Sequence, residues 1–249
     1  MRRDPFYDRF GLQHGAPHRP SKNAIRGLLK LGIPMGGTFL IEVTGFTFMA
    51  IFIARLGTTA VAGHQLASNL IALMYMMPLA LASATGTLVA QRVGAQDAAD
   101  ARRLGWHGLE LSIGLALLSG GLVFGLREQV LNLYTHDASV IAAAMPLLLW
   151  VWLFHVGDAG QTLAAFVLRA HHIASAPLVI YAVALWGIGL GGGYLLAFGP
   201  RQTVPTLLQG ASGFWFAATA GLLTAALMLS AYLARVHRIE ARGLYAETA

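Results

Sequence analysis

Long apolar stretches dominate the sequence, and short polar segments separate them. Each stretch holds roughly 20 residues or more, which at about 1.5 Å of rise per helical residue is enough to cross about 30 Å of hydrocarbon. Six such stretches lie at residues 31–54, 65–90, 104–126, 138–168, 176–199 and 207–234. The fourth is long enough to tilt or to project past the hydrocarbon. The pattern predicts an all-α integral membrane protein with six transmembrane helices.

Composition supports the membrane assignment. Apolar residues make up 56% of the chain and charged residues only 11%, whereas soluble proteins carry about 25% charged residues. The mean hydropathy is +0.62, so a soluble enzyme is excluded. The chain has no cysteine, and the fold therefore depends on helix packing without disulfides. Glycine pairs four residues apart, such as Gly32 with Gly36 and Gly187 with Gly191, are typical of closely packed membrane helices.

The basic residues predict the orientation, because Lys and Arg accumulate in cytoplasmic loops. Of the 17 Lys and Arg, 14 lie before residue 31, in the 91–103 loop, at Arg169 or after residue 234. The other side holds three, namely Arg55, Arg127 and Arg201. With an even number of spans, both termini are expected in the cytoplasm and the protein in the plasma (inner) membrane. The net charge of +6 therefore reflects topology and not nucleic-acid binding.

Three segments follow from this topology. Residues 1–30 are expected to form a cytoplasmic tail, since they contain no apolar core of the kind found in a signal peptide. Residues 31–234 form the six-helix transmembrane lobe, and residues 235–249 form a second cytoplasmic tail. Within the first tail, Asn23–Lys30 suits a short helix on the membrane surface, and an extension of the first spanning helix explains it equally well.

Two acidic residues lie inside the predicted spans. Glu42 is near the middle of the first span, and Asp158 lies within the fourth. A charged side chain at the centre of a membrane helix costs roughly 2.5–3.5 kcal/mol, and such residues usually face a bundle interior or a water-filled cavity. Either acid alone could be a structural carboxylate that bonds to a neighbouring helix. Because two of them are costly together, an ion site is the preferred interpretation.

Several ordered sequence blocks, between about Leu28 and Leu233, resemble one transporter family. The chain is similar to the C-terminal half of the multidrug and toxic compound extrusion (MATE) transporters, specifically the NorM-like members. The blocks that carry the resemblance are LKLGIP and IEVTGF around Glu42, AGHQLASN, MPLALASATGTLVAQRVGA, GDAGQ around Asp158, VLRA and GYLLAF.

The resemblance implies a fold and a function. MATE transporters have twelve spanning helices in two lobes, of which this chain would form one, and residues 1–30 resemble the linker between the lobes. They are secondary antiporters that export cationic amphipathic compounds in exchange for H⁺ or Na⁺, with no other cofactor. The resemblance assigns the coupling cation, including a possible Na⁺, to Glu42 and Asp158. It also suggests that Gln65 and Asn69 line the cavity, although amides in membranes often only bridge helices.

Further candidates surround the two acids. Thr38, Phe39 and Phe46 lie three or four residues from Glu42 and could line a substrate cavity, where the phenyl rings would stack on a cation. Ordinary helix packing explains these aromatic residues equally well. Phe154 stands where NorM-like relatives often have a tyrosine, which favours a proton over Na⁺. His155 could relay a proton to Asp158 or could simply be hydrogen-bonded within the bundle.

The half-length leaves alternatives open. Alternating access requires one lobe to move against the other, so the chain could pair with a separately encoded six-helix half, form a homodimer, or be a non-transporting fragment or assembly partner. A rhomboid-like intramembrane protease is a remote alternative, because Gly210–Gly213 reads Gly-Ala-Ser-Gly. The only histidine after Ser212 is His237, beyond the last predicted span, so the serine lacks a base.

Overall fold

Helices form every regular element in the part of the chain that the structure describes, a computed structural model covering residues 21–200, 204–205, 208–241 and 243. The long helices are α1 (Lys22–Ala54), α2 (Thr58–Gly94), α3 (Ala98–Gly125), α6 (Leu147–Ala170) and α9 (Ala211–Ala241). Another span is continuous through α7 (Ser175–Tyr181), the π-helical η2 (Ala182–Gly191) and α8 (Gly192–Phe198). Six helices are therefore long and apolar enough to cross a membrane, as the sequence predicts.

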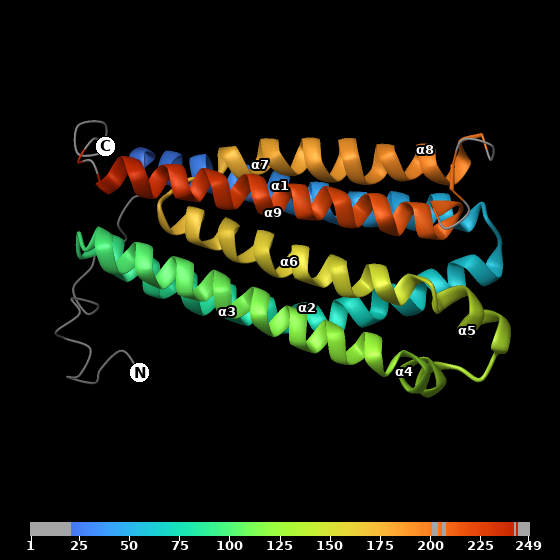
Figure 1. The fold of residues 1–249 in the computed structure, drawn as a ribbon. Helices are drawn as coiled ribbons and strands as arrows, with labels where there is room; N and C mark the ends of the chain where they lie inside the picture. Colours follow the sequence, from blue (N-terminus) through green and yellow to red (C-terminus); the bar gives the residue numbers. More distant parts are fainter. Residues whose placement is uncertain (1–20, 201–203, 206–207, 242, 244–249) are drawn as a thin grey trace, which may run out of the picture.

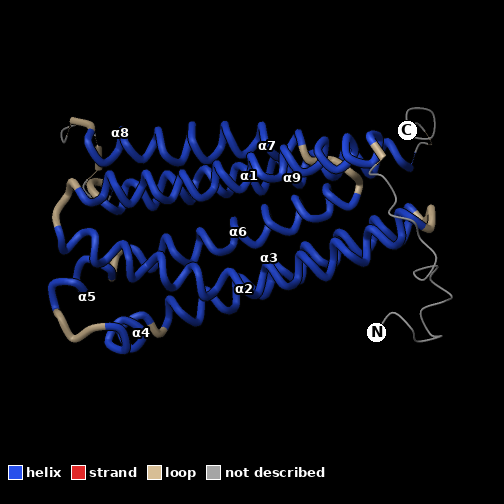
Figure 2. Tube along the Cα trace, turned by 180° about the vertical axis from the view of Figure 1, so that it is seen from behind, coloured by secondary structure: helices blue, strands red, loops and turns tan. Residues whose placement is uncertain are grey.

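The helices lie roughly parallel, and α6 runs through the middle of the bundle (Figures 1 and 2). On one side of α6 lie α1, α9 and the α7–α8 span, and on the other lie α2 and α3. Because α6 packs against α2, α3 and α9, it is the most buried of the six spans. Asp158 lies on this central helix.

The first and the last helix agree with an even number of membrane crossings. The helix α1 begins, and α9 ends, at the same end of the molecule (Figure 1). We call this the terminal end. Lys22–Ala54 is one continuous helix, so Asn23–Lys30 extends the first span instead of forming a separate surface helix. At the other terminus α9 continues helically to Ala241, past the expected boundary at residue 234. Residues 1–20, 242 and 244–249 of the two expected tails lie outside the described residues.

The fourth apolar stretch is not a single helix, contrary to expectation. It divides into the short α5 (Ala138–Ala144) and the spanning α6, and the break falls at Met145 and Pro146. Proline lacks a backbone N–H and cannot continue a helical hydrogen-bond ladder, but it is well tolerated where a helix starts. A further short helix, α4 (Arg127–Tyr134), connects α3 to this region.

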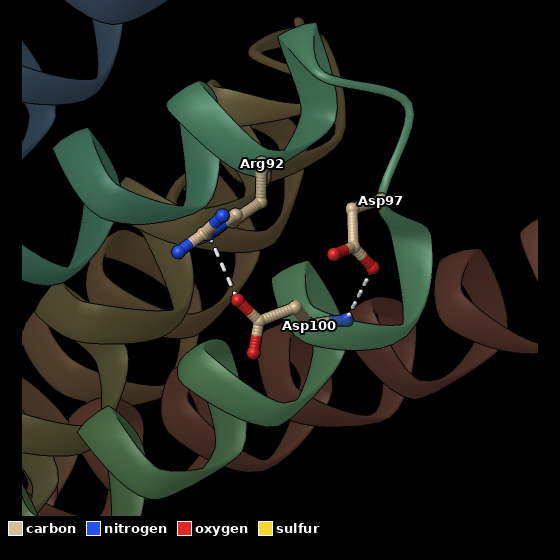
Figure 3. Close-up of polar contacts among 3 residues, drawn as sticks. All are labelled: Arg92, Asp97 and Asp100. Carbon is tan, nitrogen blue, oxygen red and sulfur yellow. Dashed lines mark hydrogen bonds and ion pairs between the residues drawn. The ribbon is translucent and has the colours of Figure 1, made fainter.

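Figure 3 shows the tight turn that connects α2 to α3. Gln96 has a left-handed φ of 60°, which allows the chain to reverse direction within a few residues. The carboxylate of Asp97 then accepts a hydrogen bond of 3.0 Å from the backbone N–H of Asp100 and caps α3. Arg92 on α2 pairs with Asp100 at 2.8 Å. Because α2 extends to Gly94 and α3 begins at Ala98, most of the expected 91–103 loop is helical.

Candidate functional site

The acids of α1 and α6 face one cavity of about 520 Å³ inside the bundle. Its walls come from α1, α2, α6, η2 and α9, and most of the side chains are apolar. The polar and charged side chains of the lining are Glu42, Thr47, Ser68, Tyr75, Asp158 and Gln161. The cavity is thus an apolar chamber with a small acidic cluster, which is the usual character of a site for an amphipathic small molecule.

Gln161 connects the two carboxylates. Its Nε2 donates a hydrogen bond of 2.8 Å to Asp158 and a weaker one of 3.5 Å to Glu42. The same nitrogen also lies 3.0 Å from the hydroxyl oxygen of Thr162. One amide therefore lies against oxygen atoms from three side chains on two helices. Asp158 sits deeper than Glu42, with only 7% of its surface exposed, whereas Glu42 is half-buried.

The acidic cluster has no close basic partner among the described residues. The described part of the chain contains two ion pairs, Arg92 with Asp100 and His171 with Glu240, and neither lies at the cavity. Arg169 acts on Glu42 only through longer-range electrostatics. The oxygen Oε1 of Gln161 is also buried, and no side chain or backbone group in the described part of the chain donates a hydrogen bond to it. Oxygen acceptors therefore outnumber donors in the cluster, which is the environment that a proton or a small hard cation favours.

Aromatic side chains form the wall beside the acids. The rings of Phe46 and Phe154 meet edge to face at 5.5 Å, and Phe154 packs in the same way on Trp215 at 5.8 Å. Phe46 and Phe154 both line the cavity, and a ring face at this position can attract an organic cation. Phe39 also belongs to the lining, at its rim, with 67% of its surface exposed.

Two of the residues expected in the cavity point elsewhere. Thr38 is buried, and its hydroxyl group donates a hydrogen bond of 2.9 Å to the carbonyl of Pro34 in its own helix. His155 is fully buried, and its Nε2 lies 3.2 Å from the hydroxyl of Ser119 on α3. His155 therefore contacts α3 and does not belong to the cavity lining, although it is close to Asp158 on the surface of α6. Among the described residues, His155 is thus hydrogen-bonded within the bundle, which is the second of the two interpretations, and it makes no hydrogen bond to Asp158 that could relay a proton.

The amides of Gln65 and Asn69 also lie outside the cavity lining. Both are exposed on α2, and Asn69 accepts a hydrogen bond of 2.9 Å from the hydroxyl of Tyr134 on α4. Asn69 thus bridges two helices, which is the alternative that the sequence left open. Ser68, between them in the chain, reaches the cavity from α2, as do Ile71 and Ala72.

Three polar residues of the cluster were not predicted from the sequence, namely Gln161, Thr162 and Tyr75. Gln161 carried a usable signal, since it follows Asp158 by three residues and belongs to the GDAGQ block. Tyr75 lines the cavity from α2, and its hydroxyl lies close enough to Thr162 to interact with it. A hydroxyl group is therefore present in the cluster, although Phe154 does not supply one.

Comparison with known proteins agrees with this architecture. The sequence model of the MatE family matches residues 34–195, which is more than half of the chain. The chain belongs to the MATE family. Its members are transporters and not enzymes.

The geometry also contradicts the protease alternative. Ser212 and His237 lie on the same helix, roughly 37 Å apart along its axis at about 1.5 Å per residue.

The chain resembles one half of its NorM-type relatives within the family. The chain is 41% identical to the probable multidrug resistance protein NorM of Aromatoleum aromaticum, over 87% of its own length and 46% of the relative's. It is 36% identical to the multidrug resistance protein PmpM of Pseudomonas aeruginosa, over 88% of its own length and 45% of the relative's. The chain thus spans about half the length of the curated relatives it matches, and it is a partial NorM-like MATE protein.

Solved structures show the same fold. The eukaryotic MATE transporter AtDTX14 superposes with a TM-score of 0.77 at 20% identity, covering 94% of this chain and 54% of AtDTX14. The MATE transporter ClbM, whose structure is a complex with Rb⁺, superposes with a TM-score of 0.76 at 21% identity, covering 96% of this chain and 52% of ClbM. The six helices therefore have the arrangement of one lobe of a MATE transporter.

Proposed function

We propose that this chain is one lobe of a secondary antiporter that exports cationic amphipathic organic compounds in exchange for H⁺ or Na⁺. The observation that carries the proposal is the pair Glu42 and Asp158. They come from two helices, share one apolar cavity and lack a close basic partner among the described residues. The multidrug resistance names of the NorM and PmpM relatives support this class of substrate.

Charge compensation supplies the coupling. Two ionised carboxylates inside a membrane bundle are costly unless a positive charge accompanies them. A proton, a Na⁺ ion or the positive group of a substrate can each supply this charge, so the arrival of one favours the departure of another. The presence of Rb⁺ in ClbM supports binding of a monovalent cation by a protein of this fold. Carboxylate, amide and hydroxyl oxygens in the cluster are suitable ligands for Na⁺ and suitable acceptors for H⁺.

A complete transporter then requires a second lobe. Because the chain spans about half the length of its curated relatives, we propose that it assembles with a separately encoded six-helix half or with a second copy of itself. The alternative, a non-transporting fragment or assembly partner, predicts no efflux in any combination. We further propose that both termini lie in the cytoplasm and that the protein occupies the inner membrane, based on the 14 to 3 distribution of Lys and Arg.

The proposal is tested by drug efflux in sensitive cells. Expressed alone, the chain should confer little or no resistance to a cationic dye such as ethidium unless it dimerises. Co-expressed with the N-terminal half of the Aromatoleum aromaticum NorM, it should confer resistance that collapses with the ion gradient. Glu42→Gln keeps the shape of the side chain but removes its titratable charge, so it should abolish efflux without reducing membrane insertion.

Glu128→Gln is the matched control, because Glu128 is exposed on α4 outside the cavity. It should leave efflux at the level of the unchanged chain. Gradient-driven efflux that persists in Glu42→Gln would show that Glu42 is structural and would refute the assignment of the coupling site. No efflux with any partner half would instead favour the non-transporting alternative.

A further inference from the structure

Three side chains that the proposed transport does not use meet at the terminal end of the bundle. They are His171, directly after the last residue of α6, and His237 with Glu240, which lie in the last turns of α9. These ends of α6 and α9 lie at the same end of the bundle (Figure 1). The nitrogen Nδ1 of His171 lies 2.7 Å from a carboxylate oxygen of Glu240. The rings of the two histidines are 5.4 Å apart between centroids. Each residue offers one ligand atom, and all three of these atoms lie within 4.8 Å of one another.

Burial makes this cluster unusual. The side chain of His171 is only 3% exposed and that of Glu240 is 19% exposed, while His237 is buried. Three ring nitrogens have no hydrogen-bond partner among the residues that the structure describes, namely Nε2 of His171 and both nitrogens of His237. A buried polar atom without a partner typically costs about 1–3 kcal/mol. The protein side chains therefore leave the hydrogen-bonding and ligating capacity of the cluster largely unused.

We infer that this cluster is a binding site for one divalent transition-metal ion of the zinc class. Two imidazoles and one carboxylate are a ligand set that Zn²⁺ commonly uses, with the fourth position open to water. His237 and Glu240 are three residues apart and so lie on neighbouring parts of one helix face. The partial exposure of Glu240 provides access for the ion and for a water ligand.

The geometry requires only a small adjustment. Ligand atoms bound to zinc at about 2.0–2.2 Å in a tetrahedron lie roughly 3.4 Å from one another. The His171–Glu240 contact would lengthen from 2.7 Å, and the widest separation, within 4.8 Å, would shorten. Rotation of the side chains can provide both changes. Arg102 acts electrostatically on His237 and opposes a cation here, so the negative charge of Glu240 is an essential part of the site.

Metal binding would fasten the end of α6 to the end of α9. His171 is also the residue at which the chain turns toward α7, because His172 directly after it has a left-handed φ of 60°. An ion at this position would therefore hold the α6–α7 turn against the last helix. The site is separate from the cavity acids, and its function does not depend on the transport proposal.

The test uses the purified full chain without a histidine tag, in detergent or nanodiscs. Zn²⁺ is titrated in competition with a chromophoric chelator, and Co²⁺ is used as a spectroscopic substitute. We expect one Zn²⁺ per chain with a dissociation constant in the micromolar range or below. We also expect the intense visible absorption of four-coordinate Co²⁺, and a higher thermal midpoint with zinc, since a ligand that binds only the folded state stabilises it.

His171→Asn, His237→Asn and Glu240→Gln should each weaken zinc binding by about tenfold or more. His172→Asn is the matched control, because this exposed neighbour in the same turn lies outside the cluster and should leave the affinity unchanged. Helical circular dichroism in metal-free buffer verifies that each variant is folded, and if one is not, the other two decide.

Absence of stoichiometric Zn²⁺ binding by the unchanged chain would overturn the inference, and the cluster would then be a hydrogen-bonded histidine pair. Binding that survives both histidine variants would equally overturn it, because the ion would then be bound elsewhere. Octahedral Co²⁺ absorption without a zinc-dependent rise in the thermal midpoint would show a weak surface contact, which also refutes the site.

Discussion

At the scale of single residues, the two cavity acids differ in their surroundings. Asp158 is buried on the central helix and receives the short hydrogen bond from Gln161, whereas Glu42 is half-buried and receives only the long one. Asp158 is therefore the better-held carboxylate, and Glu42 is the one that a ligand in the cavity reaches more easily. Gln161 lies between them and is placed to respond to the charge on both.

Replacing Gln161 should distinguish the two candidate coupling ions. Gln161→Leu removes both the donor Nε2 and the unpartnered acceptor Oε1. Hydrogen bonds to charged groups contribute about 1.5–3 kcal/mol, which corresponds to a change of roughly tenfold or more in the affinity for the coupling ion. A Na⁺ site should lose affinity because it loses an oxygen ligand. A proton site should instead gain affinity, since the charged carboxylates lose the donor that stabilises them.

The measurement is gradient-driven dye efflux by the assembled transporter, recorded against Na⁺ concentration and against pH. Gln91→Leu is the matched control, because this exposed glutamine lies at the end of α2, away from the cavity. Unaltered Na⁺ and pH dependence in Gln161→Leu would show that this amide only joins two helices.

The sequence predicts the two acids but not their full surroundings. Each acid is conspicuous because it interrupts an apolar span, and this contrast needs no knowledge of neighbouring helices. Gln65 and Gln161 are equally polar in the sequence, and their environments differ because α2 turns one outward and α6 turns the other inward. The rotation of each helix about its axis depends on packing against the others, which the apolar pattern alone does not specify.

At the scale of elements, the span from Ser175 to Phe198 packs closely against α9 beside the cavity. Its middle part is π-helical, and Leu185, Gly189 and Leu190 from this part line the cavity. Gly221 of α9 lies against it so closely that an added Cβ would be 2.5 Å from the carbonyl oxygen of Ala184 and 3.1 Å from the backbone nitrogen of Gly189. These atoms belong to the backbone and cannot move independently of the helix.

Gly221→Ala should therefore separate η2 from α9 and destabilise the protein. Overpacking of this kind typically costs about 1–3 kcal/mol. The expected result is a thermal midpoint lower by several degrees in detergent, because 1 kcal/mol corresponds to about 2–4 °C in a chain of this size. The measurement is thermal unfolding followed by circular dichroism or by a fluorescence assay.

Gly114→Ala is the matched control on α3, since nothing lies within 4 Å of a Cβ added there. It should leave the midpoint unchanged or raise it slightly, because alanine favours the helix more than glycine does. Equal midpoints for the two variants would contradict the close approach of η2 and α9.

The elements themselves were largely predictable from the apolar pattern, and their irregularities were not. Six spans follow from length and hydropathy, and both quantities are local. The break at Pro146 has a local cause in the proline, but the π-helical stretch has no comparable signal in its composition. The same apolar segment can form either α-helical or π-helical hydrogen bonds, and the contacts with neighbouring helices determine which of the two forms.

At the scale of the whole molecule, the bundle has the fold of one MATE lobe with α1 beginning and α9 ending at the same end. The structure determines that the start of α1 and the end of α9 share a side, and the charges of the chain identify that side. The distribution of Lys and Arg supplies this information, since the 14 basic residues on the terminal side include those of the α2–α3 turn.

Reporter fusions should show the terminal end in the cytoplasm. A reporter that is active only in the cytoplasm should function when fused after Ala249 or at the α2–α3 turn near Gln96. One that is active only in the periplasm should function when fused near Thr135 or in the 200–206 loop. The physical reason is the cost of moving many basic residues across the inner membrane, which favours the orientation that translocates 3 of them instead of 14. Fusions after Ala249 and in the 200–206 loop that report the same side would refute the topology. A reversal of all four signals would leave the six spans intact but would refute the cytoplasmic location of the terminal end.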